Sequence, residues 1–358
     1  MALLLLFLIF FLSQISSFLG TPTEHDESQT RLIFEGWLNT HSKSYNSSSE
    51  KEERFKIFKE NLRFINEHNA GNHSFRVGLN VFADLTNEEY RRTYLGFQLP
   101  LAEVMKGLKE SNRYRFNGTE KLPRSIDWRD KNAVVPVKNQ GNCNSCWAFS
   151  VVAATEGIYK IVKGKLISLS EQELVDCYNM GCQRGYTHLA FEFIIQIGGI
   201  DSENDYPYKG RYSFCDTSKV KKKVVSIDGY QFVPRDENSL KKAVANQPVS
   251  VAIEAFGPDF QLYTSGVYDG VCGTNLDHAV TAIGYGTDNG EDYWLVKNSW
   301  GANWGEKGYV RIKRNTNSPY GKCGIAMFPT YPIKKRHHVG EDNSFEVEIN
   351  TEGTRASA

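Results

Sequence analysis

The chain of 358 residues carries 42 Lys and Arg side chains and 42 Asp and Glu side chains, and hydrophobic residues make up 40% of it. At about 150 residues per domain, this length predicts two or three structural units. The composition excludes a disordered chain, a collagen-like repeat and a multi-span membrane protein, and the balanced charge gives no reason to expect a nucleic-acid partner.

Residues 1–20 predict a cleaved signal peptide. Residues 2–12 are apolar without a break, and small residues follow at Ser16, Ser17 and Gly20. The run is shorter than the about 20 residues that a membrane-spanning helix needs, and it fits the apolar core of a signal peptide. A buried N-terminal helix is the alternative. We therefore expect a secretory-pathway protein, either vacuolar or lysosomal or extracellular, without a membrane span. N-glycosylation sequences that agree with this route begin at Asn46, Asn72 and Asn117.

The rest of the first half predicts a helical unit followed by a linker. Within residues 31–69, one set of side chains recurs at intervals of 4, 4, 3, 4 and 4, which places the set on one face of a helix. These residues are Glu50, Arg54, Phe58, Asn61, Ile65 and Asn69. An alternating pattern that predicts an extended segment follows at Gly78, Asn80, Phe82 and Asp84. The polar residues 106–124 predict an exposed linker that is open to proteolysis.

The second half predicts a helical part followed by a β part. Residues 146–162 are apolar at helical spacing, Ser170–Glu173 form a capping box that begins another helix, and residues 189–197 predict a third. Short β-branched and aromatic segments follow at 249–255, 279–285, 293–297 and 308–313. We therefore expect a helical lobe and an antiparallel β lobe with a cleft between them, which is a common position for an active site. The basic cluster at 334–338 begins a tail that we interpret as solvated and trimmed, with a processing site or an address as the alternative.

The odd number of cysteines predicts one free thiol, because pairing in an oxidising compartment uses an even number. The 7 cysteines are Cys143, Cys146, Cys177, Cys182, Cys215, Cys272 and Cys323. Cys146 begins the apolar helix, where unpaired backbone N–H groups and the helix dipole stabilise a thiolate. Zinc is the alternative, because Cys143 and Cys146, like Cys177 and Cys182, have roughly the spacing of zinc ligands. The predicted secretory route favours disulfides, so we expect no metal.

Other residues supply the groups that an attacking thiolate needs. The side-chain amide of Gln140, together with the backbone N–H of Cys146, would form an oxyanion hole that stabilises the transition state by about 3 kcal/mol. His278, at the start of a predicted strand, would be the base, although a lone histidine is more often structural. Asn298 can accept a hydrogen bond from the imidazole and fix its orientation. Trp300 can cover that hydrogen bond, with core packing as its alternative role.

This combination resembles the papain-like cysteine proteases of plants, in which His and Asn follow the catalytic Cys at this spacing. The resemblance extends from Arg31 to Pro332, and the prosegment residues given above match the family's two prosegment motifs. It implies an α+β, papain-like two-lobe fold, with a helical left lobe and an antiparallel β-barrel-like right lobe, preceded by a helical prosegment. The implied units are a signal peptide (1–20), an inhibitory propeptide (21–121), a mostly helical lobe with Cys146 (122–230), a β lobe with His278 and Asn298 (231–333) and a disordered or trimmed tail (334–358).

The resemblance also implies the disulfides and the substrate site. The implied disulfides, which leave Cys146 free, are Cys143–Cys182, Cys177–Cys215 and Cys272–Cys323. Gly185 would pair with the substrate backbone, and Trp300 and Trp304 would belong to the substrate site. The pocket for the residue second before the scissile bond would be lined by Tyr186, Ala252, Leu276, Ala279 and Phe328. These apolar residues predict a preference for Leu, Val or Phe at that substrate position.

Two residues depart from the family pattern, because Asn144 and Arg184 stand where the family usually has glycine. Arg184 predicts a preference for an acidic residue third before the scissile bond. At Asn144 we expect the family's loop to be kept, because Asn tolerates a left-handed backbone better than other non-glycine residues.

The resulting prediction is a thiol endopeptidase that is made as a self-inhibited zymogen. Cys146 would form the acyl-enzyme and His278 would transfer the protons, without a metal or another cofactor. The expected partners are protein and peptide substrates, the chain's own propeptide and, by resemblance, cystatin-type inhibitors; we expect a monomer. One alternative is a non-catalytic papain-like binding or storage protein, which has no need for these catalytic residues. Another is a protease inhibitor built on residues 31–84.

Overall fold

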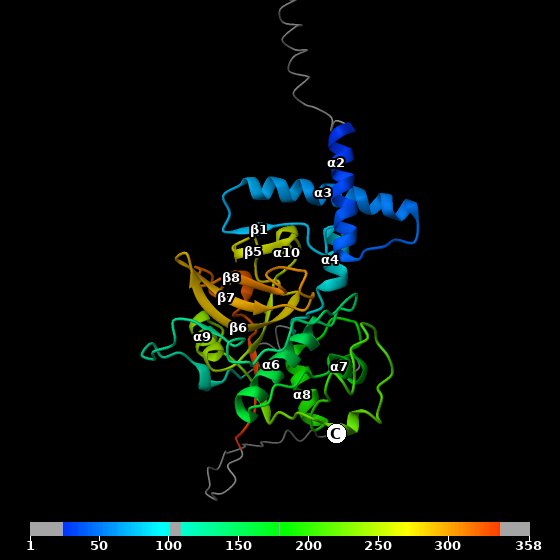
Figure 1. Ribbon diagram of the computed structural model, residues 1–358. Helices are drawn as coiled ribbons and strands as arrows, with labels where there is room; N and C mark the ends of the chain where they lie inside the picture. The colour runs from blue at the N-terminus through cyan, green and yellow to red at the C-terminus, as the bar shows by residue number, and fades with distance from the viewer. Residues whose placement is uncertain (1–23, 101–108, 179, 337–358) are drawn as a thin grey trace, which may run out of the picture.

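The computed structural model describes residues 24–100, 109–178 and 180–336. Figure 1 shows two crossed helices at one end of the molecule, a sheet beneath them and a helical part at the other end. The predicted signal peptide and most of the predicted tail, residues 337–358, lie outside the described residues. No helix among the described residues is long and apolar enough to cross a membrane.

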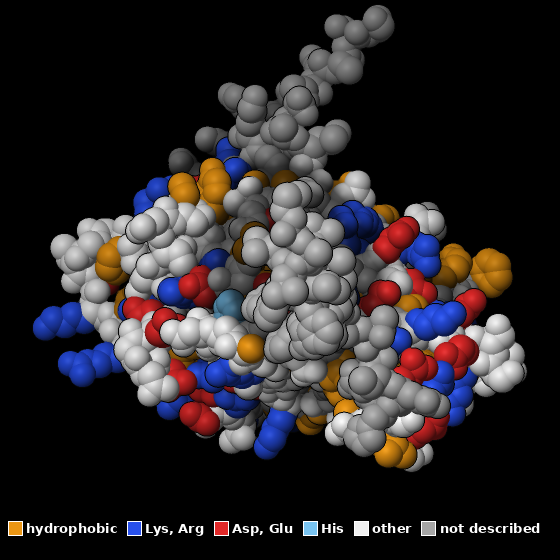
Figure 2. All heavy atoms as spheres, turned by 90° about the horizontal axis from the view of Figure 1, so that it is seen from above, with side chains coloured by type: hydrophobic (Ala, Val, Ile, Leu, Met, Phe, Trp, Pro, Cys, Tyr) orange, Lys and Arg blue, Asp and Glu red, His pale blue; other side chains and the backbone are white. Residues whose placement is uncertain are grey.

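The crossed helices belong to the N-terminal prosegment, which contains α2 (Glu24–His41), α3 (Ser48–Ala70) and α4 (Asn87–Tyr94). The six residues predicted on one helix face all lie in α3, and the region predicted as helical forms two helices, because Ser42 has a φ of 50° and the Ser47 side chain caps α3. Buried aromatic rings hold α2 and α3 together; the ring centroids of Phe34 and Phe58 are 5.0 Å apart. Seen from this end (Figure 2), Lys and Arg side chains lie among Asp and Glu side chains.

The helical lobe contains α6 (Cys146–Lys163), α7 (Glu171–Cys177) and α8 (Thr187–Gln196). Gly164 ends α6 with a φ of 76°, a left-handed conformation that glycine adopts without strain. The predicted capping box at α7 forms only in part. The Ser170 side chain accepts a hydrogen bond from the Glu173 N–H, but the Glu173 carboxylate accepts the N–H of Asp201 instead of returning to Ser170.

The β lobe is built on one mixed sheet. Its strands are β1 (Phe75–Val77), β2 (Ile126–Asp127), β3 (Gly229–Phe232), β4 (Val249–Ile253), β5 (Tyr263–Tyr268), β6 (His278–Asp288), β7 (Glu291–Lys297), β8 (Tyr309–Lys313) and β9 (Thr330–Ile333). They follow the order β1-β5-β8-β7-β6-β4-β9-β3, with β2 beside β6. The expected barrel-like closure is wrong, because the described sheet is open, with the prosegment strand β1 at one edge and β3 at the other. The expected antiparallel pairing also has an exception, since β5 and β8 are parallel.

Short helices complete the fold: α9 (Glu237–Asn246), α10 (Pro258–Gln261) and the 3-10 turns η1 (Asn112–Tyr114), η2 (Val220–Lys222) and η3 (Lys322–Gly324). Helix α6 packs against β6 and thereby joins the two lobes. Disulfides link Cys143 to Cys182, Cys177 to Cys215 and Cys272 to Cys323, which are the pairs that the resemblance implies. The first two lie in the helical lobe and the third lies in the β lobe.

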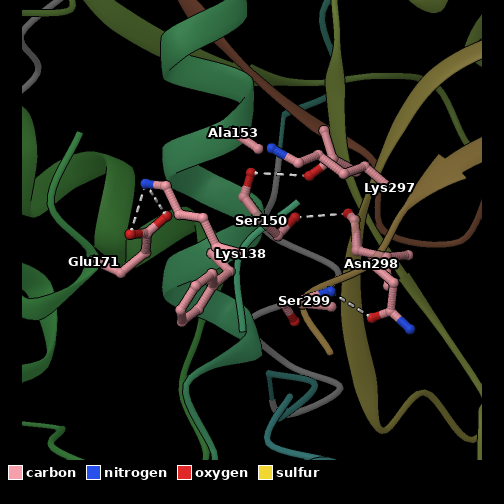
Figure 3. Close-up of a pocket in the computed structure, with 11 residues that line it drawn as sticks. Lys138, Ser150, Ala153, Glu171, Lys297, Asn298 and Ser299 are labelled. Atoms are coloured by element: carbon pink, nitrogen blue, oxygen red, sulfur yellow. Dashed lines mark hydrogen bonds and ion pairs between the residues drawn. The ribbon is translucent and has the colours of Figure 1, made fainter. Parts of the chain in front are cut away.

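Buried charges lie between the lobes (Figure 3). Lys138 Nζ lies 2.8 Å from both Glu171 carboxylate oxygens and 3.3 Å from Glu156 Oε1. Burial raises the pKa of Glu171, and the charge of Lys138 opposes that rise. Lys297, at the end of β7, is buried in the same region, and its burial lowers its pKa while Glu156 opposes the change. Because each charge depends on its partners, we expect this cluster to fix how the lobes pack.

Candidate active site

Cys146 is the free cysteine of the described residues, and it is completely buried at the first turn of α6. Its Sγ accepts the backbone N–H of Ala279, on β6, at 3.5 Å. Burial raises the pKa of the thiol to about 12, and the N–H groups of Ala279, Gly96 and Trp147 oppose that rise. We expected the helix start to favour a thiolate. In this structure burial is the largest influence on the thiol, and it opposes ionisation.

His278 begins β6, next to Ala279, and its ring is held by Asn298. His278 Nε2 lies 2.8 Å from Asn298 Oδ1, which also accepts the Ser299 N–H at 2.8 Å. Since Oδ1 can only accept, Nε2 carries the proton and Nδ1 is bare; Nδ1 has no hydrogen-bond partner. The Trp300 ring stacks on the imidazole with centroids 4.5 Å apart, so it covers the bond to Asn298 as predicted. Burial lowers the pKa of His278 to about 4, and Asn298 opposes that change.

Gln140 is buried beside the loop that leads to Cys146. Its Nε2 donates to the backbone carbonyl of Cys143 at 2.9 Å and to that of Tyr94, a prosegment residue, at 3.2 Å. Its Oε1 accepts the hydroxyl of Ser299 at 2.7 Å. Ser299 was not among the predicted site residues, although it follows Asn298 directly. Its hydroxyl fixes which end of the Gln140 amide donates.

The prosegment runs through the cleft between these groups. Gly185 N–H donates to Gly96 O at 2.9 Å, and Gln98 N–H donates to Gly185 O at 3.1 Å. These two bonds make a parallel bridge between Phe97 and Gly185. The N–H of Phe97 also donates to the carbonyl of Asp277 at 3.0 Å. The backbone of Gly185 therefore holds an extended peptide, as we expected of a substrate, but here the peptide is the chain's own prosegment.

The side chain of Phe97 fills the apolar pocket that was predicted for the substrate. Phe97 is completely buried, and its ring centroid lies 5.8 Å from that of Phe328. The other pocket residues that belong to the same buried cluster are Ala252, Leu276 and Ala279. Tyr186 is half-buried at the start of α8, and Arg184 is exposed next to Gly185.

Two aromatic side chains, Trp304 and His188, lie differently from what was predicted for the substrate site. Trp304 lies one layer behind Trp300, with centroids 4.8 Å apart, and its Nε1 donates to the carbonyl of Gln261. His188 was not predicted at this site, and its buried ring lies 5.6 Å from that of Phe328. Burial lowers the pKa of His188 to about 4. His188 lies near the start of a predicted helix, and helical periodicity does not predict that its ring contacts Phe328, which is distant in the sequence.

The loop before Cys146 contacts the prosegment through two asparagines. Asn144 Nδ2 donates to the carbonyl of Arg92 at 3.0 Å, and the Tyr94 hydroxyl donates to Asn142 Oδ1 at 3.0 Å. The φ of Asn144 is not positive, so the tolerance of asparagine for a left-handed backbone is not used here. Asn144 therefore differs from glycine here through its side chain rather than through its backbone.

The two prosegment motifs hold the prosegment together and dock it on the β lobe. Arg54 Nη1 pairs with Glu89 at 2.8 Å, and Asn61 Nδ2 donates to the carbonyls of Ala83 and Leu85. Asn80 Nδ2 donates to the carbonyl of Gln261 at 2.9 Å, across to the β lobe. The remaining motif residues contact neighbouring parts of the prosegment or of the β lobe: Glu50, Phe58, Ile65, Asn69, Gly78, Phe82 and Asp84.

The predicted glycosylation sites Asn46, Asn72 and Asn117 are all exposed. Their modification stays a prediction.

Comparison with known proteins finds relatives of both parts of the chain. Residues 122–333 match the family described as papain family cysteine protease, and residues 34–90 match the cathepsin propeptide inhibitor domain. The probable cysteine protease RD21B of Arabidopsis thaliana is 57% identical over 323 residues, covering 88% of this chain and 69% of that protein. The oryzain beta chain of Oryza sativa subsp. japonica is 55% identical over 318 residues, covering 86% of this chain and 67% of that protein.

Solved structures show the same likeness. A recombinant stem bromelain precursor is similar with a TM-score of 0.78 and 44% identity, covering 85% of this chain and 99% of that chain. The proform of Amb a 11, a cysteine protease and ragweed pollen allergen, is similar with a TM-score of 0.79 and 42% identity, covering 87% of this chain and 96% of that chain. The predicted papain-like fold, preceded by a helical prosegment, is confirmed.

Proposed function

Because this chain belongs to the papain family of cysteine proteases, we propose that it hydrolyses peptide bonds through Cys146, with His278 as general acid and base. The chain is a cysteine endopeptidase with an inhibitory propeptide. The observation that carries the catalytic assignment is the placement of Cys146 beside the N–H of Ala279, which follows His278 directly on β6. The imidazole is held from its far side by Asn298, so its bare Nδ1 is the nitrogen available to the thiol.

The proposed reaction begins when the Cys146 thiolate attacks the scissile carbonyl. Gln140 Nε2 and the Cys146 backbone N–H stabilise the negative charge that develops on the carbonyl oxygen. His278 then protonates the leaving amine, and the acyl group stays on the sulfur as a thioester. Water activated by His278 releases the acyl group and restores the thiol. Asn298 and Ser299 are positioning residues in this scheme, because they orient His278 and Gln140.

The described structure is then the proform, in which the prosegment occupies the substrate cleft. We assign residues 21–121 to the removable propeptide, residues 122–230 to the lobe with Cys146 and residues 231–333 to the lobe with His278 and Asn298. The disulfides fit a secretory-pathway protein. Cystatin-type inhibitors, which would compete for the same cleft, are proposed partners.

We further propose that the enzyme prefers apolar residues at P2, numbering P1, P2 and P3 from the scissile bond toward the substrate's N-terminus. The complete burial of Phe97 among apolar residues supports this preference. At P3 we propose a preference for acidic residues, which rests on the exposed Arg184 beside Gly185. Peptide libraries test both. Equal cleavage of peptides with Arg and with Leu at P2 would contradict the first proposal, and an unchanged P3 profile in Arg184→Gly would contradict the second.

Active-site titration tests the reaction itself. Acid-activated protein is treated with a thiol-alkylating epoxide, and labelling is compared between the wild type and Cys146→Ala. We expect about one label per wild-type molecule, none on the variant, and loss of peptidase activity in proportion to labelling. A non-catalytic binding protein would show no such proportion, and labelling of Cys146→Ala at another site would refute the assignment of the nucleophile.

A further inference from the structure

The prosegment marks which residues border the substrate position next to the nucleophile. The N–H of Gly96 points toward the sulfur of Cys146, and the next residue, Phe97, fills the proposed P2 pocket. A Cβ atom on Gly96 would lie only 2.0 Å from the carbonyl oxygen of Asn144. Asn144 therefore lies against the prosegment residue that stands at the sulfur, where the P1 residue of a substrate has to lie.

The side chain of Asn144 is only partly used in this state. Its Nδ2 donates to the carbonyl of Arg92, which belongs to the prosegment. Its Oδ1 is buried and has no hydrogen-bond partner among the described residues. When the prosegment leaves, the amide loses its one partner. The carboxamide of Asn144 then has a free donor and a free acceptor, on a residue whose backbone borders Gly96 and which lies two residues before Cys146 in the sequence.

We propose that Asn144 determines specificity at P1 and favours a P1 glutamine, a preference that rests on the proposed peptidase function. The Nδ2 group would donate to the carbonyl oxygen of the glutamine side chain, and Oδ1 would accept from its amide nitrogen. An apolar P1 side chain of the same length leaves both Asn144 groups without a partner when it covers them. A site built to pair with a polar group discriminates against an analogue that lacks it.

The test compares P1 glutamine with P1 methionine, which has similar length but no amide, in peptides with leucine fixed at P2. The enzyme is made as the full-length chain and then activated with acid. Rates are divided by the concentration of Cys146 that the epoxide can label. We expect wild-type kcat/KM to favour glutamine by about 10-fold, the effect of one to two net hydrogen bonds at a half-exposed position. Asn144→Gly should reduce this ratio to near one.

Asn142→Gly is the matched control, because Asn142 lies on the same loop and also contacts the prosegment, through the Tyr94 hydroxyl. We expect it to keep the wild-type ratio. If the wild type and Asn144→Gly have the same ratio of kcat/KM for P1 glutamine to P1 methionine, the proposal is overturned. It is also overturned if Asn144→Gly changes only the preference for substrate residues after the scissile bond. If Asn144 only holds the prosegment, Asn144→Gly will speed activation without changing the P1 ratio, which also overturns it. Failure of the peptidase function itself is distinguishable, because then no peptide is cleaved and Cys146 is not titrated.

Discussion

Truncation of Phe97 should open the inhibited cleft. Phe97, in the propeptide, is completely buried against Phe328 and its neighbours, and we expect these partner residues to remain after activation. Replacing a buried Phe with Ala costs about 3 to 5 kcal/mol. Since the lost contacts join the prosegment to the cleft, most of this cost disappears once the prosegment leaves. At 1.4 kcal/mol per factor of ten, Phe97→Ala should raise the open fraction by about 100-fold or more.

The assay follows labelling of Cys146 in the intact zymogen at neutral pH by mass spectrometry. The epoxide reaches the thiol only in open molecules, so the labelling rate reports the open fraction. Phe97→Leu keeps an apolar side chain and should have a smaller effect. The control is Leu32→Ala in α2, where the residue is 74% exposed, and this change should leave the labelling rate unchanged. Circular dichroism confirms that each variant is folded. Labelling of folded Phe97→Ala at the wild-type rate would refute the anchoring role.

Further changes probe the prosegment, the interlobe charges and the pH dependence. Gly96→Val should also speed zymogen labelling, because its Cβ meets the Asn144 carbonyl at 2.0 Å; an unchanged rate would contradict this. Lys138→Met leaves the buried Glu171 without its partner and should lower the free energy of unfolding in urea by about 3 to 5 kcal/mol; a loss below about 1 kcal/mol would contradict the structural role. Burial lowers the pKa of His188 from 6.5 to about 4, so the unfolded chain binds more protons between these values and stability falls as pH falls from 6.5 toward 4. His188→Phe should therefore show a smaller drop in Tm between pH 7 and pH 4 than the wild type does, and an equal drop would argue against this.

The sequence predicts the fold and most of the site because both depend on local patterns with a physical meaning. The apolar run after Cys146 is a helix in the structure, and Gly164 ends it. The odd number of cysteines agrees with the free thiol at Cys146. The distant residues His278 and Asn298 contact one another, since His278 begins β6, Asn298 follows β7 directly, and antiparallel pairing brings these two ends together.

The features that the sequence did not predict depend on which surfaces face each other. Periodicity places Arg54 on a helix face, but it does not reveal that Glu89 lies opposite. Phe97 lies outside any regular element, so its role as an occupant of the cleft follows only from the path of the chain. The sheet remains open because β1 and β3 end the strand order without meeting, a property of topology rather than of any one strand.

Burial as well as blockage by the prosegment opposes attack by the proposed nucleophile, Cys146, in this structure. Burial is the largest cause of both the raised pKa of Cys146, about 12, and the lowered pKa of His278, about 4. Between these values the thiol and the imidazole are both neutral, whereas the proposed attack needs a thiolate. Departure of Gly96 and Phe97 exposes this part of the cleft, which lowers the desolvation cost of a charged pair and moves both pKa values toward each other. We therefore expect departure of the prosegment both to vacate the proposed P2 pocket and to allow the Cys146 thiol to ionise.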